Sequence, residues 1–243
     1  MANNANNANS ETIILKPHQL LPIDFIKTSR GIILYHSTGS GKTLTALFGA
    51  YQFDVEVIIV GNKSSKKTFI DNLLKANLDA GRSTFYTFTK VKKILEINIT
   101  LFKGKVVIVD EAHNIRNENM YNLYVASALQ IAKKVILLTA TPVVNYLNDL
   151  SVLVNIVRGE DVLPTDRRLF EQMFYDEQEM ALINENILFD KIVSTISYYK
   201  IDDLVNYPSK TIHTMNIEMN SLTGSAILTR PILHIGLLWG ISI

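Results

Sequence analysis

The sequence of 243 residues contains no cysteine, which excludes a disulfide framework and any metal site with cysteine ligands. The formal net charge is only +1, so any affinity for nucleic acid has to come from local clusters of basic residues rather than from the whole surface. The amino terminus lacks the hydrophobic region of a signal peptide, and we expect an intracellular, non-secreted protein. Residues 1–12 are rich in asparagine and are predicted to be a disordered arm.

Patterns typical of strands and of helices alternate along the chain from residue 31 to residue 157. Such alternation predicts an α/β fold with a parallel sheet and helices on both faces. A chain of this length can hold one domain with an ample core and a smaller appendage. The predicted strands are 31–35, 55–60, 83–88, 105–109 and 134–139. The predicted helices are 43–52, 64–76, 89–96, 119–132 and 147–157.

A glycine-containing loop follows the first predicted strand, and a helical pattern follows the loop. Residues 36–43 are His-Ser-Thr-Gly-Ser-Gly-Lys-Thr. Two glycines allow successive backbone N–H groups to point at phosphate oxygens, and the helix N-terminus adds partial positive charge. Lys42 is expected to bind the β- and γ-phosphates, and Thr43 to bind Mg²⁺. A plain glycine turn with an exposed lysine is the alternative. The predicted nucleotide-binding residues of the loop are Ser37, Thr38, Gly39, Ser40, Gly41, Lys42 and Thr43.

A second motif, Asp110-Glu111-Ala112-His113, follows the predicted strand 105–109. Ligands bind at the carboxyl ends of the strands in open parallel sheets, where both motifs fall. We expect Asp110 to hold Mg²⁺ and Glu111 to orient and deprotonate the attacking water. Acidic residues also favour the start of a helix, which is the alternative for this motif alone. Taken with the phosphate loop, it predicts an ATPase site.

In this order, the motifs resemble those of the first RecA-like domain of a superfamily 2 helicase or translocase with a D-E-A-H box. The resemblance implies that His113 senses the nucleotide. The segment Thr139-Ala140-Thr141-Pro142 resembles motif III, which implies that Thr139 and Thr141 couple hydrolysis to movement. Residues 15–19 resemble the Q motif, in which Gln19 would recognise the adenine edge. His36 departs from the family pattern at its first glycine, where many helicases have other residues.

Three residues fall where members of this family contact a nucleic-acid backbone. Lys63 follows the second predicted strand, at motif Ia, whereas Thr87 and Lys90 lie at motif Ib, after the third. A solvated helix face is the alternative for the lysines, and an ordinary strand residue is the alternative for Thr87. The resemblance therefore implies ATP and Mg²⁺ as cofactors and DNA or RNA as a partner.

The finer pattern is similar to that of helicase-like ATPases of large DNA viruses, of the early-transcription-factor type. The similarity depends on Asp-Glu-Ala-His-Asn-Ile-Arg-Asn at 110–117 and on Asn145 and Asp149 after motif III. It implies a viral protein of the viral factory or virion. A second RecA-like domain or a transcription protein would be its partner in trans.

Four segments are predicted: the arm 1–12, a RecA-like domain over 13–158, a mainly helical linker or appendage over 159–217, and an atypical apolar tail over 218–243. Apolar residues at helical spacing between Leu169 and Ile196 indicate the helices of the appendage, and a strand is predicted over 210–217. Its almost wholly apolar stretch, residues 232–243, is shorter than the roughly 20 residues that span a bilayer, and we expect no membrane association. A covering segment, an out-of-frame extension and a membrane anchor are its three interpretations.

Motifs of a second RecA-like domain, including its arginine finger, are not found in the sequence. Because an arginine finger contributes several orders of magnitude in rate, we expect a helicase-type ATPase domain that hydrolyses ATP slowly by itself. A non-catalytic nucleotide- or nucleic-acid-binding remnant of a truncated helicase is the alternative. A transporter ATPase is disfavoured because the Leu-Ser-Gly-Gly-Gln signature is absent.

Overall fold

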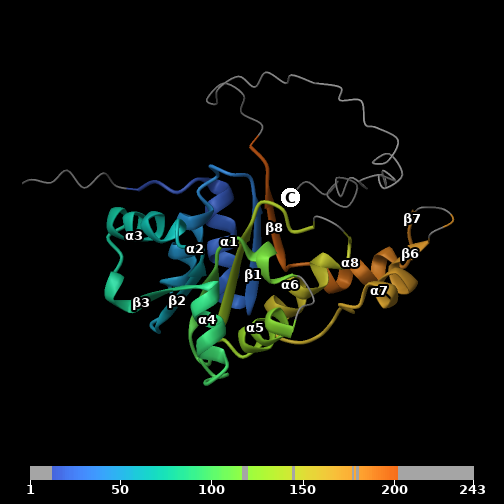
Figure 1. Ribbon diagram of the computed structural model, residues 1–243. Helices are drawn as coiled ribbons and strands as arrows, with labels where there is room; N and C mark the ends of the chain where they lie inside the picture. The colour runs from blue at the N-terminus through green and yellow to red at the C-terminus, as the bar shows by residue number, and fades with distance from the viewer. Residues whose placement is uncertain (1–12, 117–119, 144–145, 177, 179–180, 202–243) are drawn as a thin grey trace, which may run out of the picture. The chain divides into compact units, whose positions relative to one another are not determined.

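Six parallel strands form one sheet at the centre of the domain (Figure 1). The computed structural model describes residues 13–116, 120–143, 146–176, 178 and 181–201. The strand order is β3-β2-β4-β5-β1-β8, with parallel pairing throughout. The strands are β1 (Gly31–His36), β2 (Val57–Gly61), β3 (Ser83–Thr87), β4 (Val106–Val109), β5 (Lys134–Thr139) and β8 (Ile196–Tyr199).

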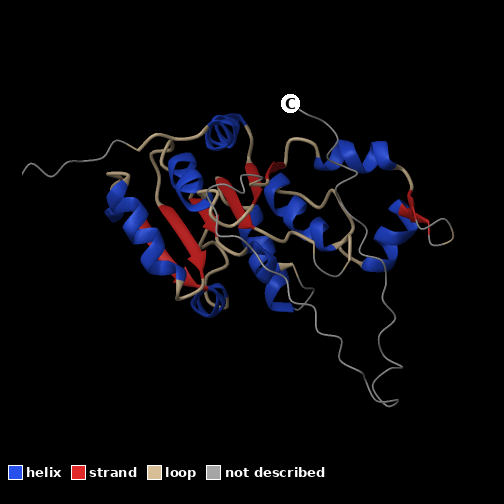
Figure 2. Cartoon of the chain, turned by 90° about the horizontal axis from the view of Figure 1, so that it is seen from above, coloured by secondary structure: helices blue, strands red, loops and turns tan. Residues whose placement is uncertain are grey.

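Helices cover both faces of the sheet, as Figure 2 shows from above. On one face lie α1 (Pro17–Thr28), α2 (Lys42–Ala50) and α3 (Ser65–Lys75). On the other lie α4 (Phe88–Leu95), α5 (Met120–Gln130) and α6 (Asp149–Arg158). Two short 3₁₀ turns, η1 (Ala80–Arg82) and η2 (Ala112–Ile115), follow α3 and β4.

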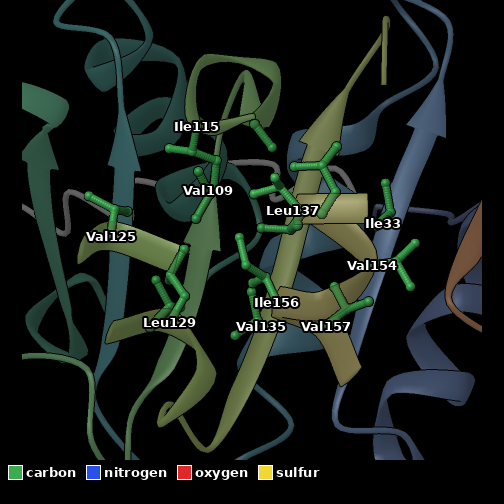
Figure 3. Close-up of a cluster of buried hydrophobic side chains, with 14 of the residues drawn as sticks. Ile33, Val109, Ile115, Val125, Leu129, Val135, Leu137, Val154, Ile156 and Val157 are labelled. Atoms are coloured by element: carbon green, nitrogen blue, oxygen red, sulfur yellow. The ribbon is translucent and has the colours of Figure 1, made fainter. Parts of the chain in front are cut away.

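The core consists of two apolar layers because successive strand residues point to opposite faces of the sheet. In β5, Ile136 and Leu138 pack in the layer under α1, α2 and α3. Val135 and Leu137 pack in the other layer, drawn in Figure 3. Burial of each such side chain contributes about 1.5–3 kcal/mol, which holds the strand ends that carry the two motifs in fixed positions.

The predicted fold class is confirmed for the central sheet. All five strands predicted between residues 31 and 139 are present, and so are the five predicted helices, with ends that differ by no more than two residues. Strand β3, with the sequence Ser-Thr-Phe-Tyr-Thr, is half-buried. The other four predicted strands are mainly apolar runs of four to six residues and are buried along almost their whole length. Such runs are typical of parallel strands with helices on both faces.

Residues 159–201 differ from the predicted helical appendage. They form α7 (Arg167–Phe174), the hairpin strands β6 (Tyr175–Asp176) and β7 (Ala181–Leu182), α8 (Glu185–Ile192) and finally β8. Strand β8 pairs with β1, so the sheet continues past the predicted domain boundary at residue 158. Ile196 begins β8 and does not continue the helical pattern that includes Ile192. A spacing of four residues fits a helix and also fits one face of a strand, so the sequence alone does not distinguish the two structures.

The unit that contains the sheet extends to Ile201. Phe170 and Phe174 of α7 and Leu188 and Ile192 of α8 are buried in the same layer as α4, α5 and α6. Within the described residues, no helix is both long enough and apolar enough to cross a bilayer. The arm 1–12, the predicted strand 210–217 and the tail 218–243 lie outside the described residues.

Candidate nucleotide-binding site

The phosphate loop connects β1 to α2 and owes its shape to two glycines. Gly39 and Gly41 have φ values of 80° and 84°, in the left-handed region that glycine adopts without strain. A Cβ on Gly41 would also lie 2.5 Å from Gln19 Nε2. The loop ends at Lys42, the first residue of α2, where the first N–H groups of the helix have no intrahelical acceptor. This geometry fits a bound phosphate chain.

The Lys42 side chain contacts the backbone of the phosphate loop and is attracted by the two acidic residues of the second motif. Its ammonium group donates to His36 O at 2.6 Å and to Ser37 O at 2.9 Å. Burial lowers the pKa of Lys42, while attraction to the carboxylates of Glu111 and Asp110 acts in the opposite direction. The lysine and the two acidic residues, predicted from separate motifs, are therefore electrostatic neighbours.

The acidic motif follows β4 directly. The Asp110 N–H donates to Val60 O at 2.7 Å, which extends the pairing of β4 with β2. Burial raises the pKa of Asp110, and the neighbouring Ser65 hydroxyl opposes this shift. Glu111 adopts a φ of 50°, an uncommon conformation outside glycine. A partly buried carboxylate of this kind is suited to a cation.

Ser65 lies at the site although the sequence patterns did not predict it there. It begins α3 and is brought to Asp110 by the close approach at Gly61. A Cβ on Gly61 would lie 2.9 Å from Ser65 Oγ and 3.2 Å from Asp110 Cβ. The one signal for Ser65 in the sequence is its position: it is a hydroxyl residue shortly after the end of β2, and β2 is the strand that pairs with β4.

The structure brings His113, Thr139 and Thr141 together beside Glu111. His113 Nδ1 lies 3.2 Å from Glu111 Oε2 and 3.5 Å from Thr139 Oγ1. The Thr141 N–H donates to Thr139 Oγ1 at 3.0 Å. The acidic motif is thereby linked to the end of β5 and to the segment after it. The coupling role of the two threonines stays a prediction.

Arg116 makes a second link that sequence reasoning missed. Its Nε lies 3.5 Å from Asp149 Oδ2, and the two side chains are only 10% and 11% exposed. Its Nη1 donates to Thr141 O at 3.4 Å. Arg116 follows η2 and Asp149 begins α6, so this buried ion pair fixes the acidic motif, the segment after β5 and α6 relative to one another.

Gln19 lies under the phosphate loop and is 5% exposed. Its Oε1 accepts from the Lys16 N–H at 2.9 Å, and its Nε2 donates to Gly41 O at 3.4 Å. These contacts place it against the turn that precedes Lys42. Recognition of the adenine edge by Gln19 stays a prediction.

His36, in the first-glycine position of the loop pattern, is completely buried. Its Nε2 lies 2.8 Å from Ser197 Oγ of β8. Burial, and then the neighbouring charges of His18 and Lys42, lower the pKa of His36 to about 4. The imidazole is therefore neutral at physiological pH and serves as a packing group between two strands.

The residues predicted to contact nucleic acid follow two neighbouring strands. Gly61 of β2 is in register with Thr87 of β3, so Lys63 and Lys90 come after adjacent strand ends. Both lysines are exposed. Thr87 Oγ1 caps α4 by accepting from the Lys90 N–H at 3.3 Å, and the Lys90 ammonium lies 5.1 Å from the centre of the Tyr86 ring. Thr87 therefore has a local structural role at this edge.

The donor set fits a metal–triphosphate complex. Thr43 and Asp110 offer the oxygen ligands that Mg²⁺ prefers in combination with phosphate and water. Among the described residues there is no group of three or more His, Asp or Glu side chains that could hold a metal by itself.

Comparison with known proteins identifies the family and the relatives of this chain. The SNF2-related domain family matches residues 48–226. The chain is 65% identical over 212 residues to the Acanthamoeba polyphaga mimivirus protein named "Putative ATP-dependent RNA helicase L538", covering 87% of this chain and 48% of that protein. It is 28% identical over 223 residues to the early transcription factor 70 kDa subunit of Molluscum contagiosum virus subtype 1, covering 81% of this chain and 34% of the subunit.

A solved structure has the same fold. The chain is similar to the Sulfolobus solfataricus SWI2/SNF2 ATPase core in complex with dsDNA, with a TM-score of 0.63 over 78% of this chain and 45% of that chain. The sequence identity is 19%, so this likeness concerns the fold alone. The chain spans about half the length of the mimivirus relative and about a third of the poxvirus subunit.

Proposed function

The chain belongs to the SNF2-related domain family of helicase-type ATPases, and we propose that it binds ATP with Mg²⁺ and hydrolyses it. The predicted resemblance to helicase-like ATPases of large DNA viruses is confirmed by the mimivirus and poxvirus relatives. The observation that supports the proposal most is the electrostatic proximity of Lys42 to Asp110 and Glu111, because these groups come from two separate motifs.

Each residue has a defined task in this proposal. The N–H groups of the loop and of the first turn of α2 bind phosphate oxygens, and Lys42 exchanges its carbonyl contacts for the β- and γ-phosphates. Thr43 and Asp110 hold the metal, which neutralises charge on the phosphates. Glu111 orients the attacking water and accepts its proton.

His113, Thr139 and Thr141 transmit the state of this site in our proposal. A change at Glu111 alters the 3.2 Å contact with His113, and His113 contacts Thr139. The backbone N–H of Thr141 is tied to Thr139, so the segment after β5 moves with it. This chain of contacts is the physical basis for coupling hydrolysis to movement on nucleic acid.

The turnover of residues 1–243 by themselves is expected to be slow. Three arginines of the described domain make contacts away from the phosphate loop. Arg30 donates to carbonyl oxygens at the ends of α5 and α6, and Arg158 does so at the end of α8. Arg116 pairs with Asp149. None of them is placed to stabilise charge that develops on a γ-phosphate, the task of an arginine finger.

A steady-state ATPase assay on this polypeptide, with and without single-stranded DNA or RNA, tests the proposal. We expect slow turnover that falls at least about 100-fold in Glu111→Gln, because general-base catalysis contributes roughly 10²–10⁴-fold. Nucleotide affinity should change little in that variant. Turnover that is equal in Glu111→Gln would rule out the assigned base, and fast nucleic-acid-stimulated turnover would rule out the slow-alone proposal.

We also propose that the exposed lysines after β2 and β3 bind the backbone of DNA or RNA. Replacing Lys90, Lys92 and Lys93 with alanine should weaken single-strand binding and reduce its dependence on salt, because each phosphate contact releases counterions. Replacing Lys133 and Lys134, which follow α5 on the way into β5, is the matched control. An unchanged salt slope in the triple variant would contradict this proposal.

A further inference from the structure

Strand β8 contacts the phosphate loop and α1 directly. The Ser37 N–H donates to Tyr199 O at 2.9 Å, and the Ile201 N–H donates to the Ser37 hydroxyl at 3.1 Å. The Tyr199 ring stacks on the His18 ring, with ring centres 3.6 Å apart and planes 2° from parallel. The end of β8 is thus joined to the first residue of the loop and to the start of α1.

His18 extends this contact to the far side of the loop. Its Nε2 lies 3.0 Å from the carbonyl oxygen of Ser40, a residue that is 6% exposed. Ser40 directly precedes Gly41, whose left-handed conformation turns the chain into Lys42. Tyr199 supports His18, and His18 supports the turn that positions the lysine.

The His36 ring connects β1 to the same cluster. It meets the Tyr199 ring edge-on, with centres 5.9 Å apart, and the His18 ring in the same way at 6.0 Å. Three rings from α1, β1 and β8 therefore pack together beside the loop. None of the three belongs to the groups that would touch a phosphate.

We propose that Tyr199 is a positioning residue of the nucleotide site: through His18 and Ser37 it holds the phosphate loop in the conformation that accepts the triphosphate. The inference rests on the proposed function and extends the site to β8, a strand outside all of the recognised motifs. Ile201, two residues after β8, adds a second contact to Ser37.

A ring beside a phosphate loop could instead contact a purine base. The two roles differ in the ligands that they affect. A residue that supports the loop strengthens the binding of any polyphosphate, whereas a residue that contacts the base strengthens only the binding of nucleotides. Inorganic tripolyphosphate, which has no base, distinguishes the two.

The test measures the dissociation constants of Mg²⁺–ADP and of Mg²⁺–tripolyphosphate by calorimetry on the full chain. We expect Tyr199→Ala to weaken both by roughly tenfold, in line with the loss of one aromatic stack. Tyr199→Phe retains the ring and should rescue both affinities. Unchanged affinities in Tyr199→Ala, or a loss for ADP alone, would overturn the proposal.

Tyr198→Ala is the matched control. Tyr198 is the neighbouring residue on β8, and its ring packs against Tyr35 with centres 5.0 Å apart. Successive strand residues point to opposite faces, so this ring lies on the other side of the sheet from His18. We expect Tyr198→Ala to bind both ligands like the unmodified chain. If Tyr198→Ala lost as much affinity as Tyr199→Ala, the loss would reflect general damage to β8, and the proposal would be overturned.

Two further variants separate this inference from the proposed function. If Tyr199→Ala does not fold, His18→Ala removes the same stack from α1 and carries the same expectation and the same overturning result. If the unmodified chain binds neither ligand, or binds both equally well after Lys42→Ala, the proposed function fails. If Lys42→Ala abolishes binding but Tyr199→Ala and His18→Ala do not weaken it, only the present inference fails.

Discussion

Individual residues of the phosphate loop are constrained by backbone shape as much as by chemistry. Gly41 needs a left-handed φ and also a side chain small enough to leave room for Gln19. Glu111 adopts a left-handed φ without being glycine, and this strain falls on the residue assigned as general base. Sequence patterns predicted both residues, because glycine and paired carboxylates are characteristic at those positions. They did not predict Ser65, because a single hydroxyl residue carries no recognisable pattern, and they included Arg116 in the motif at 110–117 without assigning it a contact.

Gly41→Ala tests the constraint on the loop. We expect a loss of about 1–2 kcal/mol in the free energy of unfolding from the left-handed backbone, and a further loss from displacement of Gln19. Gly104→Ala is the matched control, because Gly104 has a φ of 74° but no atom within 4 Å of its added Cβ. Urea denaturation of both variants provides the measurement. Equal losses in the two would show that the contact with Gln19 is unimportant.

At the scale of elements, the five strands between residues 31 and 139 were predictable, whereas helix α1 and strand β8 were not. The buried strands are continuous apolar runs, so their positions follow from local sequence. Helix α1 was not predicted, because proline occupies its first position and recurs at Pro22. Strand β8 is only four residues long and half-buried, and its place beside β1 depends on tertiary packing rather than on a local signal.

The packing of β1 against β8 predicts a dependence of stability on pH through His36. Its pKa in the folded chain, about 4, lies below the ordinary value of 6.5, so the folded state disfavours the protonated ring. The contribution of His36 is complete above pH 6.5 and is lost as the pH falls towards 4. We expect the free energy of unfolding to fall by about 2 kcal/mol through His36 when the pH is lowered from 7 to 5.

Chemical denaturation of the unmodified chain and of His36→Gln at several pH values checks this prediction. Glutamine retains a hydrogen-bonding group for Ser197 but does not titrate in this range. His18 and Lys42, the charged neighbours that lower the pKa of His36, are present in both proteins. Parallel pH profiles for the two proteins would show that His36 does not carry the effect.

At the scale of the whole molecule, the fold brings two motifs from distant parts of the sequence to one edge of the sheet. The phosphate loop follows β1 and the acidic motif follows β4, and only β5 lies between these strands. Thr139, the last residue of β5, contacts His113 of the acidic motif. The proximity of the two motifs is therefore a consequence of strand order, which the predicted parallel sheet anticipated, whereas the roles of the site residues stay predictions. The extension of the domain to Ile201 was not predictable, because β8 has no motif of its own.

The central claim is that Lys42 and the residues around it bind a triphosphate with Mg²⁺. Isothermal titration calorimetry with Mg²⁺ and a non-hydrolysable ATP analogue, on the unmodified chain and on Lys42→Ala, tests it most directly. The structure predicts a saturable heat of binding for the unmodified chain and its loss in Lys42→Ala. Absence of heat in the unmodified chain, or the same heat in both proteins, would contradict the claim.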